Sequence, residues 1–256
     1  MLAAGYATRL RPLTDQVAKP LLPLAGRPML DYLYEKIAAV PDVDEVHVVT
    51  NSRFAGDFRL WGEGVADPVP IVIHDDGTMW NEDRLGAIGD IRFLLERGLR
   101  GEELLVVAGD NLFDFELGEF VAFWRKKGGY GSAVCVHDVG DLELIRQYSM
   151  VELDEEDRIT SLVEKPEEPR STLAGIAVYL FRAEHAELVD EYLSEGNSPD
   201  QPGRFVVWLY QRVPIYGYRF PGEWLDIGDR DQLLDADNRM RVREGLPLRT
   251  EYSLEK

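Results

Sequence analysis

Positive charge is concentrated near the start of this chain of 256 residues. Residues 1–30 carry a local charge of +3, because a single acid, Asp15, stands against four bases: Arg9, Arg11, Lys19 and Arg27. Gly5 lies where the apolar opening of the chain gives way to this basic segment. A strand that breaks into such a loop leaves backbone N–H groups free to point at phosphate oxygens. The opening segment therefore predicts a phosphate-binding loop.

Two carboxylates, far apart in the sequence, are candidate ligands for a metal ion. Asp110 follows the apolar run 104–108, and Asp226 lies between Trp224 and Gly228. A carboxylate at the carboxyl end of a parallel strand faces the crevice in which open α/β sheets bind ligands. Read alone, each is typical of a turn or of a helix cap. Together they could hold one Mg²⁺ through oxygen, with positions left for phosphate and water.

A known family shares these features. The signature loop of the sugar-1-phosphate nucleotidylyltransferases resembles residues 2–14, LAAGYATRLRPLT, followed by Lys19-Pro20-Leu21. The resemblance continues in family order at Gly109-Asp110, at Glu164-Lys165-Pro166 and at residues 224–228, so it covers almost the whole chain. The first motif is highly specific, whereas the others alone are weak. The resemblance implies an α/β fold: a Rossmann-like, three-layer α/β/α nucleotidyltransferase domain of the GT-A-like kind, with a mixed, mainly parallel sheet.

The resemblance also implies a reaction. In this family the phosphate of a sugar-1-phosphate attacks the α-phosphorus of a nucleoside triphosphate, and pyrophosphate leaves. Such chemistry needs positioning and charge neutralisation rather than a covalent nucleophile. By resemblance, Arg9 stabilises the triphosphate and the leaving pyrophosphate, and Lys19 contacts the phosphates at the reacting centre. The residues expected to bind the nucleotide are Leu2, Ala3, Gly5, Thr8, Arg9 and Gly86.

The same resemblance assigns the metal and the acceptor. Asp110 and Asp226 match the two family residues that hold Mg²⁺. Glu164 matches the family glutamate that contacts sugar hydroxyls, and Lys165 matches the lysine that contacts the sugar-linked phosphate. Gly86 is expected to open a helix beside the base and ribose. The Leu-Ala-Ala-Gly opening leans toward dTTP, UTP and CTP, with dTTP favoured. We therefore expect a cytoplasmic, Mg²⁺-dependent enzyme that makes a nucleoside diphosphate sugar from an NTP and a sugar-1-phosphate.

The sequence departs from the family pattern at four places: Ala7, Ser149, Ile176-Ala177 and Pro202-Gly203-Arg204. Ala7 replaces a second glycine, and its methyl group is tolerable if φ is negative. The other three departures bear on the acceptor pocket, because the thymidylyltransferases usually have Gly, Thr-Gly and Arg-Gly-Glu there. The residues expected to carry the phosphate chemistry therefore match the family pattern, whereas those of the acceptor pocket differ from it.

Two alternative functions stay open. The altered acceptor residues allow a cytidylyltransferase that acts on a phosphoalcohol such as phosphocholine. A non-catalytic, nucleotide-sugar-binding regulatory homologue is the other alternative, and it predicts the loss of a basic or acidic site residue. All four of these residues, Arg9, Lys19, Asp110 and Asp226, are present.

Composition limits the partners. The chain has 47 acidic against 28 basic residues, a formal charge of −19, which argues against non-specific binding to nucleic acid or to an anionic membrane. Cys135 is the only cysteine, which favours a reducing cytosol and excludes an internal disulfide. No signal peptide is visible at the start of the sequence. Homo-oligomers are common in the family, so an oligomer is compatible with the sequence.

Strand and helix patterns alternate over the first half of the chain, which predicts a mainly parallel sheet covered on both faces. We expect one domain over residues 1–256, with a nucleotide-binding half at 1–138, an acceptor-binding half at 139–228 and a C-terminal helix and tail at 229–256. The acidic turn at 154–157 predicts a hairpin between residues 150–153 and 158–164. Only four residues precede Gly5, fewer than the family usually has. Since the first strand of this fold is central, we expect the true start codon to lie upstream.

Overall fold

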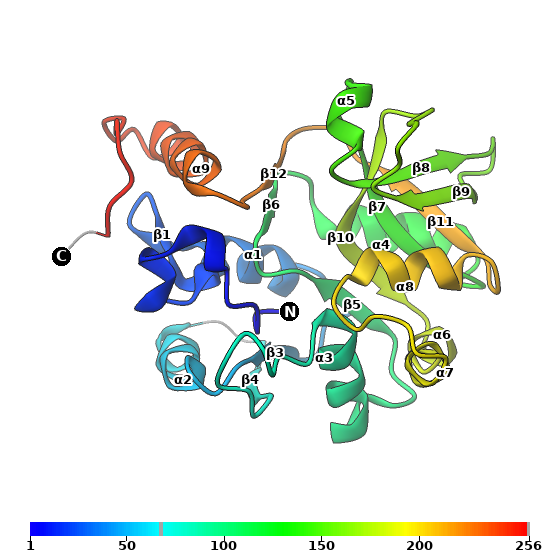
Figure 1. Cartoon of the computed structure of the whole chain (residues 1–256), viewed down its shortest axis with the longest axis horizontal. Coiled ribbons are helices and arrows are strands. Elements are labelled where there is room, and N and C mark those ends of the chain that lie inside the picture. The colour runs from blue at the N-terminus through cyan, green and yellow to red at the C-terminus, as the bar shows by residue number, and fades with distance from the viewer. Residues whose placement is uncertain (67–68, 255–256) are drawn as a thin grey trace. The chain divides into compact units, whose positions relative to one another are not determined.

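The computed structural model describes residues 1–66 and 69–254. The chain divides into two compact units, which we describe one at a time (Figure 1). The first unit contains Met1–Arg84, Ala108–Asp114 and Glu223–Lys256, and the second contains Leu85–Val107 and Phe115–Gly222. Residues 255–256 of the expected tail lie outside the described residues. The single domain expected from the sequence stays a prediction.

Parallel strands form the centre of the first unit. Strand β3 (Val46–Thr50) pairs in parallel with β4 (Ile71–Asp75), and Leu2 forms parallel bridges to Val49 on one side and to Ala108 on the other. The amide of Ala3 donates to the carbonyl of Val49 at 2.9 Å. The opening segment therefore is central, as expected, but it is reduced to a single bridged residue.

Two antiparallel pairs complete the strands of this unit. Strand β1 (Pro23–Leu24) pairs with β2 (Arg27–Pro28), and β6 (Asn111–Phe113) pairs with β12 (Trp224–Asp226). The sequence did not indicate β6 or β12, because three residues are too few to display a strand period. Their pairing nevertheless joins segments that are more than a hundred residues apart.

The described part of the first unit contains three α-helices: α1 (Met29–Ala38), α2 (Ala55–Gly64) and α9 (Arg230–Arg243). In α1 the side chains of Met29, Leu33 and Ile37 are buried at the i, i+4, i+8 spacing of one helix face. Asp229 caps α9 by accepting from the amide of Gln232 at 2.9 Å, and the Gln232 side chain completes a capping box.

The sheet of the second unit has the order β11-β7-β10-β8-β9, with β5 also paired to β10. The nine-residue strand β10 (Leu173–Phe181) runs antiparallel to β7 (Ser132–Asp138), β8 (Ser149–Leu153) and β5 (Leu104–Val107). β11 (Ile215–Arg219) is parallel to β7, and β9 (Ile159–Glu164) forms the expected hairpin with β8. The expected mixed α/β fold is confirmed; its strands are parallel around Leu2 and mostly antiparallel around β10.

The helices of the second unit are α3 (Ala87–Leu94), α4 (Leu117–Lys126), α5 (Leu142–Ile145), α6 (Ala183–Ala186), α7 (Val189–Ser194) and α8 (Pro202–Leu209). Helix α4 packs against β7 and β11, and α8 packs against β9 and β10. Helix α6 ends at Ala186 and α7 begins at Val189, so this stretch holds two short helices. Helix α8 starts at Pro202, whose missing N–H and fixed φ suit a first helical position.

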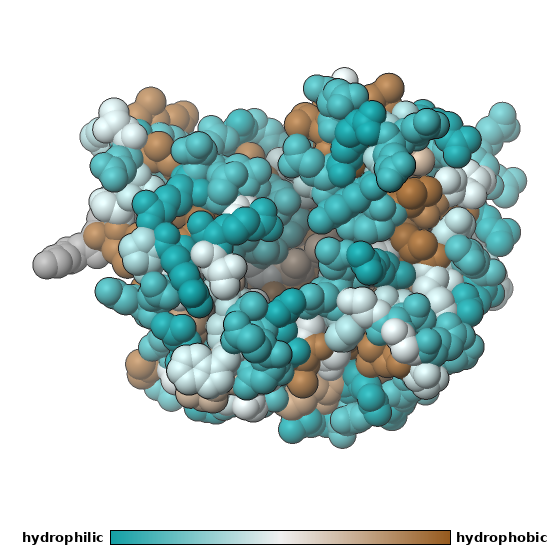
Figure 2. Space-filling model, viewed as in Figure 1, coloured by the Kyte–Doolittle hydropathy of each residue, from teal (hydrophilic) through white to brown (hydrophobic). Residues whose placement is uncertain are grey.

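The core is apolar and the surface is charged. Cys135 is fully buried on β7, and burial raises the pKa of its thiol well above the usual value. Figure 2 shows that the face drawn is mostly hydrophilic, with apolar residues in separate small patches. No helix within the described ranges is long and apolar enough to cross a membrane.

Candidate active site

The basic loop of the first unit folds around the carbonyl of Ala7. That oxygen accepts from the amide of Leu10 at 3.0 Å and from the hydroxyl of Thr14 at 2.9 Å, which closes a short helical turn over Thr8–Leu10. Ala7 itself has φ 43° and ψ 49°, in the left-handed region. The condition set from the sequence, a negative φ at Ala7, is therefore not met. A side chain in this region costs about 1–2 kcal/mol relative to the right-handed conformation.

Space is open beside Gly5. A Cβ built on Gly5 has no atom within 4 Å, so packing against the protein does not require glycine there. Leu2 and Ala3, two of the expected nucleotide contacts, form the bridged strand that leads into the loop. The expected nucleotide role of this segment stays a prediction, and the open space is where a ligand could approach the backbone.

Lys19 and Asp110 form an ion pair. The Lys19 Nζ donates to Asp110 Oδ2 at 2.9 Å, and the lysine side chain is only 9% exposed whereas that of Asp110 is 40% exposed. Burial raises the pKa of Asp110, but the charge of Lys19 and hydrogen bonds from Lys19 and Asn111 outweigh it and hold that pKa below its usual value. The carboxylate is thus charged and oriented.

The pairing of β6 with β12 brings Asp226 to the same place. Asp226 lies opposite Asn111, the residue after Asp110. Burial raises the pKa of Asp226, and the nearby charge of Asp110 raises it further, while Lys19 and Arg9 oppose both effects. Two carboxylates and two cations from distant parts of the sequence therefore act on one another electrostatically.

Asn111 links the two carboxylate motifs, and sequence reasoning gave it no role. Its amide nitrogen donates to Asp110 Oδ1 at 3.0 Å, and its amide oxygen accepts from the Trp224 indole at 2.8 Å. The side chain is 5% exposed. A buried asparagine in the otherwise apolar run Asn111-Leu112-Phe113 was the signal that could have identified it.

The donor set suits a hard divalent cation. Asp110 and Asp226 offer only oxygen, which Mg²⁺ prefers, and the like-charge effect on Asp226 is what a cation between them would relieve. The described part of the chain contains no cluster of three or more His, Cys, Asp or Glu side chains able to hold a metal. Further ligands would therefore come from phosphate and water, as Mg²⁺ commonly accepts.

Helix α9 contacts the basic loop directly, which the sequence did not indicate. Arg230 donates to the carbonyl of Arg11 at 2.8 Å. A Cβ built on Gly228 would lie 3.5 Å from Nη1 of Arg9, so the Arg9 guanidinium packs against the turn between Asp226 and α9. The first turn of α9 and the turn before it thus support the loop that carries Arg9.

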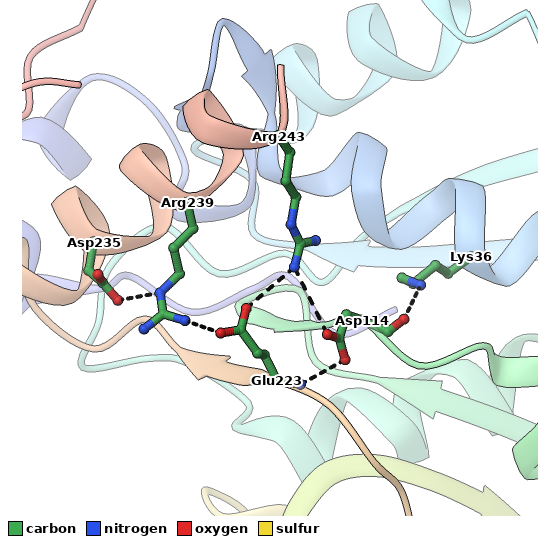
Figure 3. A network of polar contacts seen from close by, with 6 residues as sticks. All are labelled: Lys36, Asp114, Glu223, Asp235, Arg239 and Arg243. Atoms are coloured by element: carbon green, nitrogen blue, oxygen red, sulfur yellow. Dashed lines mark hydrogen bonds and ion pairs between the residues drawn. The ribbon is translucent and has the colours of Figure 1, made fainter. Parts of the chain in front are cut away.

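A network of charged side chains lies where β6 ends and β12 begins (Figure 3). It comprises Lys36, Asp114, Glu223, Asp235, Arg239 and Arg243. The amide of Glu223 donates to Asp114 Oδ1 at 2.7 Å, and Arg243 lies within 4.0 Å of both carboxylates. Arg239 pairs with Glu223 and with Asp235, so two turns of α9 are tied to this strand pair.

In the second unit, Glu164 ends β9 beside Ser149 of β8. The two residues face each other in the antiparallel register, and the Ser149 hydroxyl donates to Glu164 Oε2. Lys165 follows with φ 48°, in the left-handed region, and its amide donates to the carbonyl of Tyr148 at 2.9 Å. Strained, non-glycine positions of this kind are concentrated at functional sites. The acceptor roles of Glu164 and Lys165 stay predictions.

Gly86 is the N-cap of α3, as expected for a residue that opens a helix. Its φ is 77°, and a Cβ there would lie 2.6 Å from the carbonyl oxygen of Pro199, so glycine is required. The same carbonyl accepts from the amide of Ile88 at 2.8 Å and thereby occupies one of the donors at this helix end. The nucleotide contact expected of Gly86 stays a prediction.

Comparison with known proteins identifies the family. The chain belongs to the nucleotidyl transferase family, whose model matches residues 1–242. It is 27% identical to the bifunctional protein GlmU of Methanocaldococcus jannaschii, over 93% of this chain and 52% of that protein. It is 29% identical to a UTP–glucose-1-phosphate uridylyltransferase of Synechocystis, over 89% of this chain and 59% of that protein. The chain therefore spans little more than half the length of these relatives.

A solved structure supports the fold. The crystal structure of a putative glucose-1-phosphate thymidylyltransferase from Bacillus anthracis, in complex with sucrose, has a TM-score of 0.77 to this chain. The similarity covers 94% of this chain and 93% of that one, at 22% sequence identity. At this identity the likeness establishes the fold, which is the α/β nucleotidyltransferase fold expected from the sequence.

Proposed function

We propose that this protein transfers a nucleoside monophosphate from an NTP to a sugar-1-phosphate and releases pyrophosphate. The observation that carries the proposal is the convergence, within the first unit, of Arg9, Lys19, Asp110 and Asp226. In the reaction an oxygen of the sugar phosphate forms a bond to the α-phosphorus, and the bond from that phosphorus to the β-phosphate oxygen breaks. Pyrophosphate departs with the electron pair, so the site must stabilise added negative charge.

Each of the four residues has its own part in the proposed stabilisation of negative charge. Arg9, which packs against the turn at Gly228, would neutralise the triphosphate and the departing pyrophosphate. Lys19 is held by Asp110, so its ammonium group stays at the carboxylates rather than in solvent. Asp110 and Asp226 would hold Mg²⁺, which when bound neutralises phosphate charge as a Lewis acid. Nucleotidyl transferases of this family are generally dependent on a divalent metal.

The nucleobase and the acceptor are finer parts of the proposal. We propose dTTP as the preferred nucleotide, on the basis of the Leu-Ala-Ala-Gly opening, although the Synechocystis relative is named for UTP. We propose that Glu164 and Lys165 contact the sugar-1-phosphate. A second copy of the chain is a further expected partner.

Pyrophosphate release tests the proposal. Five NTPs are combined in turn with several sugar-1-phosphates and with phosphocholine, in Mg²⁺ and in EDTA. We expect release with at least one sugar-1-phosphate, abolished by EDTA and highest with dTTP. If pyrophosphate is released only with phosphocholine and CTP, the acceptor is a phosphoalcohol and not a sugar-1-phosphate. Nucleotide binding without any release would identify a non-catalytic protein and contradict the proposal.

A further inference from the structure

Ser149, Glu164 and Gly175 form one row across three strands of the second unit. Ser149 on β8 lies opposite Glu164 on β9 and opposite Gly175 on β10. Residues opposite each other in antiparallel strands project from the same face of the sheet. Because Gly175 has no side chain, the row presents one hydroxyl and one carboxylate beside a bare stretch of backbone.

The first turn of α8 closes over this row. A Cβ built on Gly203 would lie 2.6 Å from Ser149 Oγ and 2.7 Å from Glu164 Oε2. Real Cβ atoms do not approach other atoms this closely, so a side chain at position 203 would push the Ser149 hydroxyl and the Glu164 carboxylate out of their present positions. The partial positive charge of a helix N-terminus also favours a carboxylate at this position.

One carboxylate oxygen of Glu164 is therefore already used. Oε2 accepts from Ser149 and lies against Gly203, so the protein occupies one side of the carboxylate. A carboxylate that kept both oxygens available could bind two neighbouring hydroxyls at once. With Oε2 bonded to Ser149, fewer acceptor positions of the carboxylate remain for a ligand.

We propose that Ser149 and Gly203 are positioning residues for Glu164, and that the protein recognises its phosphorylated acceptor through a single hydroxyl bound to Glu164 Oε1. This inference rests on the proposed function, in which Glu164 contacts the acceptor. One departure from the family pattern, Ser149, contacts this carboxylate, and Gly203, which the family's Arg-Gly-Glu segment also has at its centre, leaves room for it. The two residues narrow its recognition of the acceptor and leave the phosphate-binding residues of the first unit unchanged.

Two variants test the inference. Ser149→Ala removes the hydrogen bond to Glu164, and Gly203→Ala inserts a methyl group where the carboxylate lies. Gly118→Ala is the matched control, because Gly118 also stands second in a helix, α4, and a Cβ there has no atom within 4 Å. Alanine has a higher helix propensity than the glycine it replaces in Gly203→Ala and Gly118→Ala. Ser149→Ala removes only one hydroxyl group from strand β8. We therefore expect all three variants to be folded, as measured by circular dichroism.

The readout is the KM for the acceptor set against the KM for the NTP. We expect Ser149→Ala and Gly203→Ala to raise the acceptor KM about tenfold or more, as for loss of a hydrogen bond to a charged group, with the NTP KM changed less than twofold. Gly118→Ala should match the wild type in both. Acceptor KM values within twofold of the wild type in both test variants would overturn the inference.

Deoxy analogues of the preferred sugar-1-phosphate add a second readout that a merely structural defect would not move. We expect one deoxy position to lose most of its kcat/KM with the wild-type protein and to lose much less with Ser149→Ala. Equal losses at two neighbouring positions would show a bidentate carboxylate and contradict the single-hydroxyl contact. If the wild-type protein releases no pyrophosphate with any acceptor, the proposed function itself fails, and this inference fails with it.

Discussion

Left-handed backbone conformations mark residues in both units. Ala7 in the basic loop and Ala25 in the β1–β2 turn have φ of 43° and 50°, and Lys165 has φ of 48°. The sequence placed Ala7 and Lys165 in candidate sites, but it could not give the sign of φ, because that sign depends on hydrogen bonds to Thr14 and Tyr148. Glycine would adopt these conformations without a steric penalty.

We expect Ala7→Gly and Ala25→Gly each to stabilise the protein by about 1 kcal/mol, since both remove a strained methyl group. Ala25 serves as the control, because it lies in the β1–β2 turn and carries no expected ligand contact. Urea unfolding measures the stability, and pyrophosphate release measures the NTP KM. The idea that Ala7 narrows the phosphate approach requires a lower NTP KM in Ala7→Gly only; equal KM values in both variants would contradict it.

The carboxylate of Asp110 is also a residue-scale feature. We expect Asp110→Asn to lower kcat by orders of magnitude, because the amide cannot supply the charge that Lys19 and a divalent cation require. The fold should survive with a lower melting temperature, because the nearly buried Lys19 ammonium group loses its ion-pair partner. Asp44→Asn, a change at an exposed aspartate of the same unit, is the control and should keep full activity. Near-normal turnover in Asp110→Asn would remove Asp110 from the metal site.

At the scale of elements, local patterns predicted the alternation of strands and helices in the first half and the β8–β9 hairpin, whereas long-range pairing brought the candidate site residues together. The apolar spacing of α1 and the acidic turn between β8 and β9 each specify an element within one stretch of sequence. The register that sets Asp226 opposite Asn111 has no local signal, since it depends on packing between remote segments. Residue types identified Asp110 and Asp226 as candidate ligands one at a time, and the family resemblance supplied their pairing.

The capping box of α9 is the element-scale test. We expect Asp229→Ala to cost about 1 kcal/mol, because it leaves the Gln232 amide without its acceptor. For a chain of this size that corresponds to a fall of about 2–4 °C in Tm. Asp231→Ala, in the same first turn but not the N-cap, loses only a charge near the helix N-terminus and should shift Tm less. Equal shifts in the two variants would show that the cap contributes no more than its charge.

At the scale of the whole molecule, net charge and local charge point in different directions. The formal charge is −19, yet the segment of residues 1–30 carries +3 and holds Arg9 and Lys19. The total argues against polyanionic partners, and its distribution identifies the loop that we propose binds phosphate. Among the described acidic residues, only Asp76, Asp90 and Asp237 are buried.

We expect added NaCl to raise the melting temperature, because it screens repulsion among surface carboxylates of a molecule with this net charge. Most of the gain should occur as NaCl rises to about 0.3 M. At that concentration the Debye length has already fallen to about 6 Å, so further salt adds little screening. Differential scanning fluorimetry across a NaCl series, with an equal series of a neutral osmolyte as control, measures the effect. A flat or falling Tm would show that ion pairs such as those of Arg239 and Arg243 outweigh the repulsion.

The buried thiol of Cys135 has a practical consequence. Maleimide dyes react with thiolates, and a fully buried thiol with a raised pKa supplies almost none. A cysteine introduced at an exposed position of each unit would therefore accept a fluorophore without removal of the native one. Donor and acceptor dyes attached in this way would report, by energy transfer in solution, whether nucleotide and acceptor change the separation of the two units.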